Sequence, residues 1–180
     1  SESAHREALA IRRKLLGEKH PDVASSLNNL GAVLYARGDY AAAEPLYREA
    51  LALRRELLGD AHPDVAEAQN NLAELLFDLG DYAAAEPLYR AALALNQQLY
   101  GDKHRRVATA LNNLAGLLYT QGEYGEAVRL GRQALATARE LLGDEHPDVA
   151  QSLNNLGFFL SAQGDYAEAE RQYREALATY

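Results

Sequence analysis

The chain has 180 residues, of which 24% are charged, and its formal net charge is -8 at pH 7. Nucleic-acid binding needs clustered Lys and Arg to neutralise phosphates, so this acidic balance argues against a nucleic-acid partner. The chain contains no Cys, which excludes disulfides and cysteine-bound zinc, and no apolar run approaches the roughly 20 residues of a membrane span. No charged-then-apolar leader opens the sequence, and we therefore expect a cytoplasmic protein without a membrane segment.

One unit of sequence recurs along the whole chain at a constant spacing. His20, His62, His104 and His146 follow one another at intervals of 42 residues. Residues 1–17 match the second half of this unit, and four repeats follow at 18–59, 60–101, 102–143 and 144–180, the last of them shortened. Repetition at a fixed period predicts a single elongated array in which each unit contacts its neighbours, in place of one globular core.

Each repeat predicts two helices separated by a short breaker. Pro21, Pro63 and Pro147 stand where the first helix should begin, because a proline in the first turn loses no hydrogen bond. The second helix should begin after a capping Asp39, Asp81 or Asp165, with Glu123 a poorer substitute in the third repeat. Connections of two or three residues allow only antiparallel pairs, so the sequence predicts an all-α chain of about nine helices.

The histidines of the repeated His-Pro-Asp motif raise the possibility of acid–base pairs or metal ligands. Successive copies are two packed helices apart, or roughly 16–20 Å, which is too far for them to share a metal ion. One His and one Asp are also too few ligands for a firm site. The favoured interpretation is a helix-start turn in which His20, His62 and His146 bond the local backbone.

Several short motifs recur in register and resemble a known family. They are Leu27-Asn28-Asn29-Leu30-Gly31, then Gly38-Asp39-Tyr40, then Ala50-Leu51, and together they resemble the tetratricopeptide repeat. The longer period, with His20-Pro21-Asp22-Val23-Ala24 and Leu57-Leu58-Gly59, is similar to the kinesin light chain branch of that family. The resemblance implies a right-handed α-solenoid, or superhelix, of antiparallel helix pairs. Its concave groove, lined by the first helices, would hold a peptide or a helix of a partner.

Two adjacent asparagines lie in the middle of every first helix, where Asn is a mediocre helix former. They are Asn28 and Asn29, Asn70 and Asn71, Asn112 and Asn113, and Asn154 and Asn155. One interpretation is that one Asn of each pair ties neighbouring repeats together by bonding a helix end. The other is that Asn29, Asn71, Asn113 and Asn155 point into the groove and bond a ligand's backbone, because an amide offers both a donor and an acceptor.

The remaining positions on the same helical face carry no basic residue, unlike the kinesin light chains that the motifs resemble. Glu67, Glu74 and Asp78 instead make the middle of the groove negative, which favours a neutral, basic or apolar segment over an acidic one. Aromatic side chains on this face either contact apolar ligand side chains or pack between adjacent first helices. These are Tyr35, Phe77, Tyr119 and Phe158.

Nothing in the sequence resembles a nucleophile elbow, a phosphate loop or a carboxylate dyad, since the glycines are helix terminators at fixed spacing. We therefore expect no enzymatic activity, no cofactor and no metal, and a protein or peptide partner held in the groove. The alternative is an architectural arm of a larger protein, for instance a bacterial signalling protein, whose groove or ends are occupied by its own chain. Neither end of the array has a polar capping helix, so end-to-end self-association is also expected.

Overall fold

The computed structural model describes residues 2–178, which form nine helices and, within that range, no strand. The helices are α1 (Glu2–Leu16), α2 (Pro21–Ala36), α3 (Tyr40–Leu58), α4 (Pro63–Asp78), α5 (Tyr82–Tyr100), α6 (Arg105–Thr120), α7 (Tyr124–Leu142), α8 (Pro147–Gln163) and α9 (Tyr166–Ala178). The first helices of the repeats are thus α2, α4, α6 and α8, and the second helices are α1, α3, α5, α7 and α9.

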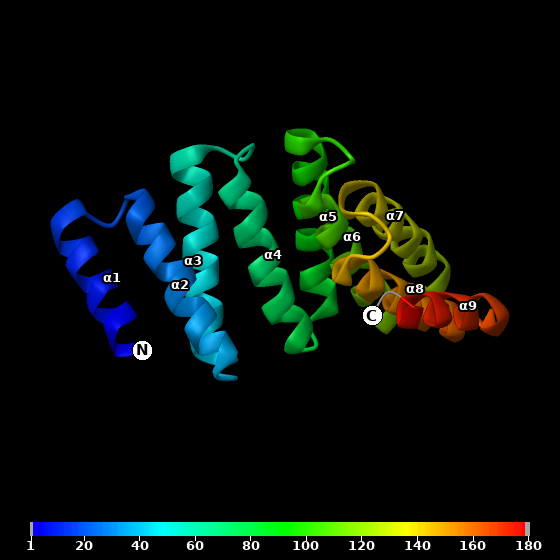
Figure 1. Ribbon diagram of the computed structural model, residues 1–180. Helices are drawn as coiled ribbons and strands as arrows, with labels where there is room; N and C mark the ends of the chain where they lie inside the picture. Colours follow the sequence, from blue (N-terminus) through cyan, green and yellow to red (C-terminus); the bar gives the residue numbers. More distant parts are fainter. Residues whose placement is uncertain (1, 179–180) are drawn as a thin grey trace. The chain divides into compact units, whose positions relative to one another are not determined.

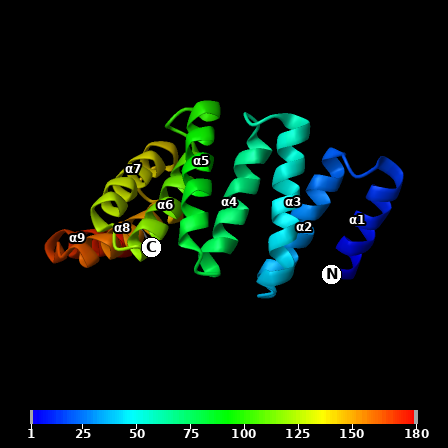
Figure 2. The same cartoon turned by 180° about the vertical axis from the view of Figure 1, so that it is seen from behind.

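The chain divides within α5 into two compact units, residues 1–95 and 96–180. In the first unit α1 packs on α2, α2 on α3 and α3 on α4, while α2 also reaches α4 directly. In the second unit α6 packs on α7, α7 on α8 and α8 on α9, and α6 reaches α8. Figures 1 and 2 show α1 to α4 following one another in chain order from both sides. Each unit is therefore an α-solenoid segment in which neighbouring first helices meet along one face.

Every first helix begins at a histidine cap. The Nδ1 atoms of His20, His62 and His146 each accept a hydrogen bond from the backbone N–H two residues later, at 3.1 Å. The prediction that these histidines bond the local backbone is confirmed. His104 caps α6 in the same way, with Nδ1 accepting from the Arg106 N–H at 3.1 Å, although Arg105-Arg106 replaces the Pro-Asp of the other repeats.

The second helices begin as the sequence predicts. Asp39, Asp81 and Asp165 each accept, through Oδ1, the backbone N–H three residues later at 3.1–3.2 Å. Glu123 makes no side-chain capping bond at the start of α7. The preceding turn uses a glycine in the left-handed region, as at Gly38 with φ 77°, which residues with a Cβ rarely adopt.

The contact between the two helices of a repeat depends on pairing a small residue with a ring. A Cβ added to Gly31 would lie 2.9 Å from the ring of the buried Tyr47, so the glycine leaves room for that ring. The position of Tyr47 is taken in the third repeat by Gly131. There the ring of Phe159 from α8 lies against the glycine, 3.1 Å from where a Cβ would stand. In the third repeat, Phe159 of the following repeat therefore packs beside Gly131, the position that carries a tyrosine ring in the first repeat.

Candidate functional site

The asparagine pairs of the first unit meet between α2 and α4. Asn28 is buried, and its Oδ1 accepts a hydrogen bond from Asn71 Nδ2 at 3.0 Å. Asn29 is exposed, whereas Asn70 and Asn71 are half-buried. An asparagine thus does connect neighbouring repeats, but it bonds a side chain of the next first helix and not a helix end.

The asparagines of the second unit have different partners. Asn112 Nδ2 lies 3.4 Å from Ser152 Oγ on α8, which connects α6 to α8 by a long hydrogen bond. Asn155 Oδ1 accepts from Gln151 Nε2 of its own helix at 2.9 Å. Asn113 and Asn154 are half-buried. Binding of a ligand by any of the predicted asparagines stays a prediction.

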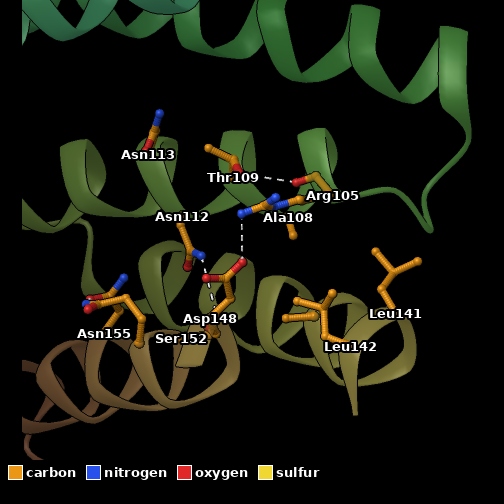
Figure 3. A pocket seen from close by; sticks show the side chains of 12 residues that line it. Arg105, Ala108, Thr109, Asn112, Asn113, Leu141, Leu142, Asp148, Ser152 and Asn155 are labelled. Carbon is orange, nitrogen blue, oxygen red and sulfur yellow. Dashed lines mark hydrogen bonds and ion pairs between the residues drawn. The ribbon is translucent and has the colours of Figure 1, made fainter. Parts of the chain in front are cut away.

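A cavity of about 300 Å³ opens between α6 and α8, with α7 behind it. Asn112, Asn113 and Asn155 line it together with Ser152 and Ala138. Figure 3 shows Asn112 directed toward Ser152, while Asn113 and Asn155 lie farther along their helices. The Asn112 Oδ1 atom is buried and finds no hydrogen-bond partner among residues 2–178. Buried acceptors are nearly always bonded, so this oxygen is an exception among the described residues.

One pair of charged groups closes the rim of this cavity. Arg105 Nη2 lies 3.1 Å from Asp148 Oδ2, joining the first turns of α6 and α8. The Arg105 side chain is 73% exposed. An ion pair between such exposed groups is worth only about 0–1 kcal/mol, so Arg105 can move away at little cost.

The acidic residues predicted for the middle of the groove lie in the first unit beside Tyr35. The Tyr35 hydroxyl donates to Asp78 Oδ2 at 2.5 Å, from α2 to α4. Burial raises the pKa of Glu74, the nearby Asp78 raises it further, and the Tyr35 hydroxyl lowers it in part. The pKa of the Tyr35 hydroxyl is itself raised, first by burial and then by its bond to Asp78 and the charge of Glu74.

The third predicted acidic residue, Glu67, has a cation beside it that the sequence pattern of the first helices does not show. Arg54 reaches it from the second helix α3, with Nη1 3.4 Å from Glu67 Oε1 and 2.8 Å from the backbone oxygen of Asp64. The Arg54 side chain is only 7% exposed. A buried arginine of α3 therefore lies beside the predicted acidic residue Glu67. The sequence signal that could have revealed this arginine is its recurrence, since Arg12 and Arg54 occupy the same position of successive repeats.

The aromatic side chains of the first helices pack on the chain itself. Tyr35, Phe77 and Tyr119 contact Tyr40, Tyr82 and Tyr124, the first residues of the following helices, at ring-centroid distances of 5.4, 5.5 and 5.7 Å. Phe158 packs on Tyr119 across adjacent first helices at 4.5 Å. Phe158 nevertheless stays 50% exposed, so its outer face remains open to another molecule.

Within residues 2–178, no three His, Asp or Glu side chains converge on a point where a metal ion could bind. None of the helices in that range combines the length and the apolar character that crossing a bilayer requires.

Comparisons with known proteins agree with this architecture. Two family models, both described as tetratricopeptide repeat, match the chain, one over residues 64–140 and 112–180 and the other over residues 1–22 and 23–64. No curated protein sequence matches it.

Solved structures place the chain beside kinesin light chain-like proteins. BtubC (BKLC) from P. vanneervenii is 32% identical, and the match covers 99% of this chain and 71% of that one with a TM-score of 0.90. A putative kinesin light chain of Podosopora anserina with nearly identical TPR-like repeats is 25% identical, covered at 99% and 84%, with a TM-score of 0.88. MamA, at 19% identity, 99% and 85% coverage and a TM-score of 0.69, shares the fold alone. The resemblance to the kinesin light chain-like branch is thereby confirmed.

Proposed function

The chain belongs to the tetratricopeptide repeat family, whose members generally act through protein partners, and from this premise we propose that it is a non-catalytic peptide-binding module. The first helices hold an extended segment of a partner protein along the face that carries the asparagines. An extended peptide leaves its own backbone donors and acceptors unpaired, and amide side chains can bond both.

One observation carries this proposal. In the second unit three of the predicted asparagines, Asn112, Asn113 and Asn155, line the same cavity between α6 and α8, and the buried Asn112 Oδ1 has no partner within the described residues 2–178. A volume of about 300 Å³ is at the lower end of the range of small-ligand pockets, which suits one side chain of a bound peptide. The site has no cofactor in this proposal, because neither a metal nor a prosthetic group is needed to hold a peptide.

The charge of the first unit favours a neutral, basic or apolar partner. Glu74 and Asp78 lie close enough together that Asp78 raises the pKa of Glu74. An acidic segment or a nucleic-acid phosphate placed beside them would meet like charge, whereas a basic or apolar segment would not.

A peptide-library screen tests the proposal. The double variant Asn113→Ala with Asn155→Ala removes two amides that line the cavity, and Asn154→Ala on α8 is the matched control that does not line it. We expect selected peptides to bind the double variant at least about tenfold more weakly, or roughly 1.4 kcal/mol, and to bind the control unchanged. Equal binding to wild type and double variant, both folded by circular dichroism, contradicts the proposal.

A second candidate function is that of an architectural arm that associates with further copies or with the rest of a larger protein. It is favoured by the apolar side chains that α1 and α9 leave uncovered, chiefly Leu15, 74% exposed, and Leu177, 76% exposed. Exposed apolar faces on terminal repeats favour stacking of one array on another.

A further inference from the structure

One position of the second helices differs from repeat to repeat in a way that explains the cavity. Residues 12, 54, 96 and 138 are successive copies of it, and they are Arg12, Arg54, Asn96 and Ala138. Arg12 Nη1 donates to the Asp22 backbone oxygen at 3.2 Å and lies 2.7 Å from Ser26 Oγ. Arg54 makes the corresponding bond to the Asp64 backbone oxygen at 2.8 Å. At positions 12 and 54 a guanidinium thus lies against the first turns of the next first helix.

The acceptors of that guanidinium persist at α8, where the arginine does not. Asp148 and Ser152 are the copies of Asp22 and Ser26, and Ala138 stands where Arg12 stands in the earlier repeat. The cavity lies at this place, lined by Ala138, Asp148 and Ser152. The Ser152 hydroxyl donates to the Asp148 backbone oxygen at 2.9 Å, the copy of the oxygen that Arg12 bonds at α2. Because a hydroxyl can rotate, Ser152 can also turn to accept a bond from a guest.

Several polar atoms around the cavity can accept a hydrogen bond from a guest. Ser152 Oγ can accept, the Asp148 carboxylate lies at the rim, and Asn112, which also lines the cavity, has a buried Oδ1 with no partner among residues 2–178. A guanidinium is planar, carries five N–H donors and is weakly hydrated, so it can bond several converging acceptors at once. An ammonium is a strongly hydrated point charge and fits this arrangement less well. Arg105, a cation at the rim, is exposed and can move from Asp148 into solvent.

We propose that the cavity between α6 and α8 binds an arginine side chain of an extended partner peptide, which enters the place that Arg12 and Arg54 fill from within the chain. This inference rests on the proposed function, because the arginine is presented by a peptide held along the first helices. It adds the identity of one side chain of that peptide, which the peptide-binding proposal alone does not specify.

Labelled seven-residue peptides of Gly and Ala with one central residue test the assignment. The central residue is arginine, lysine or citrulline, the last being a neutral side chain of nearly the same shape as arginine. We expect the arginine peptide to bind wild type at least about tenfold more tightly than either of the others, measured by fluorescence anisotropy. Capped arginine without flanking residues should compete only weakly. This comparison shows whether the cavity binds arginine as part of a peptide or binds any small guanidinium compound.

Two variants of the protein complete the test. Ala138→Arg supplies from within the chain the side chain that positions 12 and 54 already carry, so the arginine peptide should lose at least about tenfold in affinity. Asn112→Asp keeps the shape of the side chain and adds a negative charge, so affinity for the arginine peptide should rise severalfold. If Ala138→Arg does not fold, the affinity of Asn112→Asp for the arginine peptide tests the arginine assignment.

Different results overturn the two proposals. If library-selected peptides bind wild type but arginine, lysine and citrulline peptides bind alike, or if Ala138→Arg folds and leaves arginine binding unchanged, the arginine assignment is wrong and peptide binding stands. If no peptide from the library binds wild type, both proposals fail. Strong binding of capped arginine alone, equal to that of the peptide, contradicts the peptide source.

Discussion

At the scale of single residues, packing in the first unit changes the acid–base behaviour of Glu74. Partial burial is the first cause of its raised pKa and Asp78 is the second, although the residue as a whole stays exposed. Glu74 in turn affects the buried Tyr47. Burial, followed by the negative charge of Glu74, raises the pKa of Tyr47 to about 12. Glu74 thus lies in a part of the chain where a negative charge is unfavourable.

We predict that Glu74→Gln stabilises the protein at pH 7. Below the ordinary value of 4.5 the carboxyl is neutral in both folded and unfolded chains, and it then imposes no penalty. As pH rises through the raised folded pKa, ionisation costs the folded state more, so the stability of wild type falls while that of the variant does not. Urea unfolding at pH 4 and pH 7 should show a gain at pH 7 that disappears on acidification.

Glu7→Gln on the exposed side of α1 is the control for the removal of one negative charge. It should change the free energy of unfolding by less than about 0.5 kcal/mol at either pH. A Glu74→Gln protein that is less stable than wild type at pH 7, or a gain that persists at pH 4, contradicts the argument.

At the scale of helices, α7 begins without the side-chain cap that starts α3, α5 and α9. Glu123 has the cap position but makes no side-chain bond, whereas Asp39 Oδ1 accepts the Ala42 N–H at the start of α3. The longer side chain of Glu is not among the residues that favour this position, and Asp is.

We predict that Glu123→Asp raises the free energy of unfolding by about 0.5–1 kcal/mol and that the reverse control, Asp39→Ala, lowers it by about 1 kcal/mol. Both follow from gaining or losing one bond to a backbone N–H that the helix itself leaves unpaired. Midpoints of urea unfolding compare the variants with wild type. If Asp39→Ala loses stability and Glu123→Asp gains none, the start of α7 is limited by something other than its cap.

At the scale of the whole molecule, stability comes from successive contacts, since within each unit a helix packs on its neighbours in the chain or on the next first helix. Within the described chain α1 packs on α2 and α9 packs on α8, and these two helices leave Leu15 and Leu177 open to solvent. Such arrays gain by covering these faces.

We predict that the chain self-associates as its concentration rises and that Leu15→Lys with Leu177→Lys abolishes the association. Stacking would bury each lysine ammonium without an ion-pair or hydrogen-bond partner, and this desolvation cost disfavours the stacked state. Light scattering after size exclusion measures the mass. Leu79→Lys, at a position 46% exposed between α4 and α5, is the matched control and should associate as wild type does. A wild type with the mass of one chain at every concentration removes the support for the architectural candidate.

Much of the fold follows from the sequence because its causes are local. The 42-residue period, the proline at a helix start, the aspartate cap and the glycine terminator each act within a few residues, and the structure has the predicted helix pairs. Even the histidines are explained locally, by an Nδ1 atom that accepts an N–H two residues later. Three of the predicted asparagines also line one cavity in the second unit, although what they bind stays a prediction.

The sequence by itself therefore determined the family, the helix boundaries and the face on which a partner is expected. Only the tertiary structure decided which side chains of different repeats meet. Arg54 reaches Glu67, Asn71 bonds Asn28, and Phe159 lies against Gly131. The cavity beside Ala138 is of the same kind, because it depends on a missing side chain in one helix and on acceptors kept in the next. Such contacts join residues far apart in the chain, and their distances are set by how the helices pack and not by any local pattern.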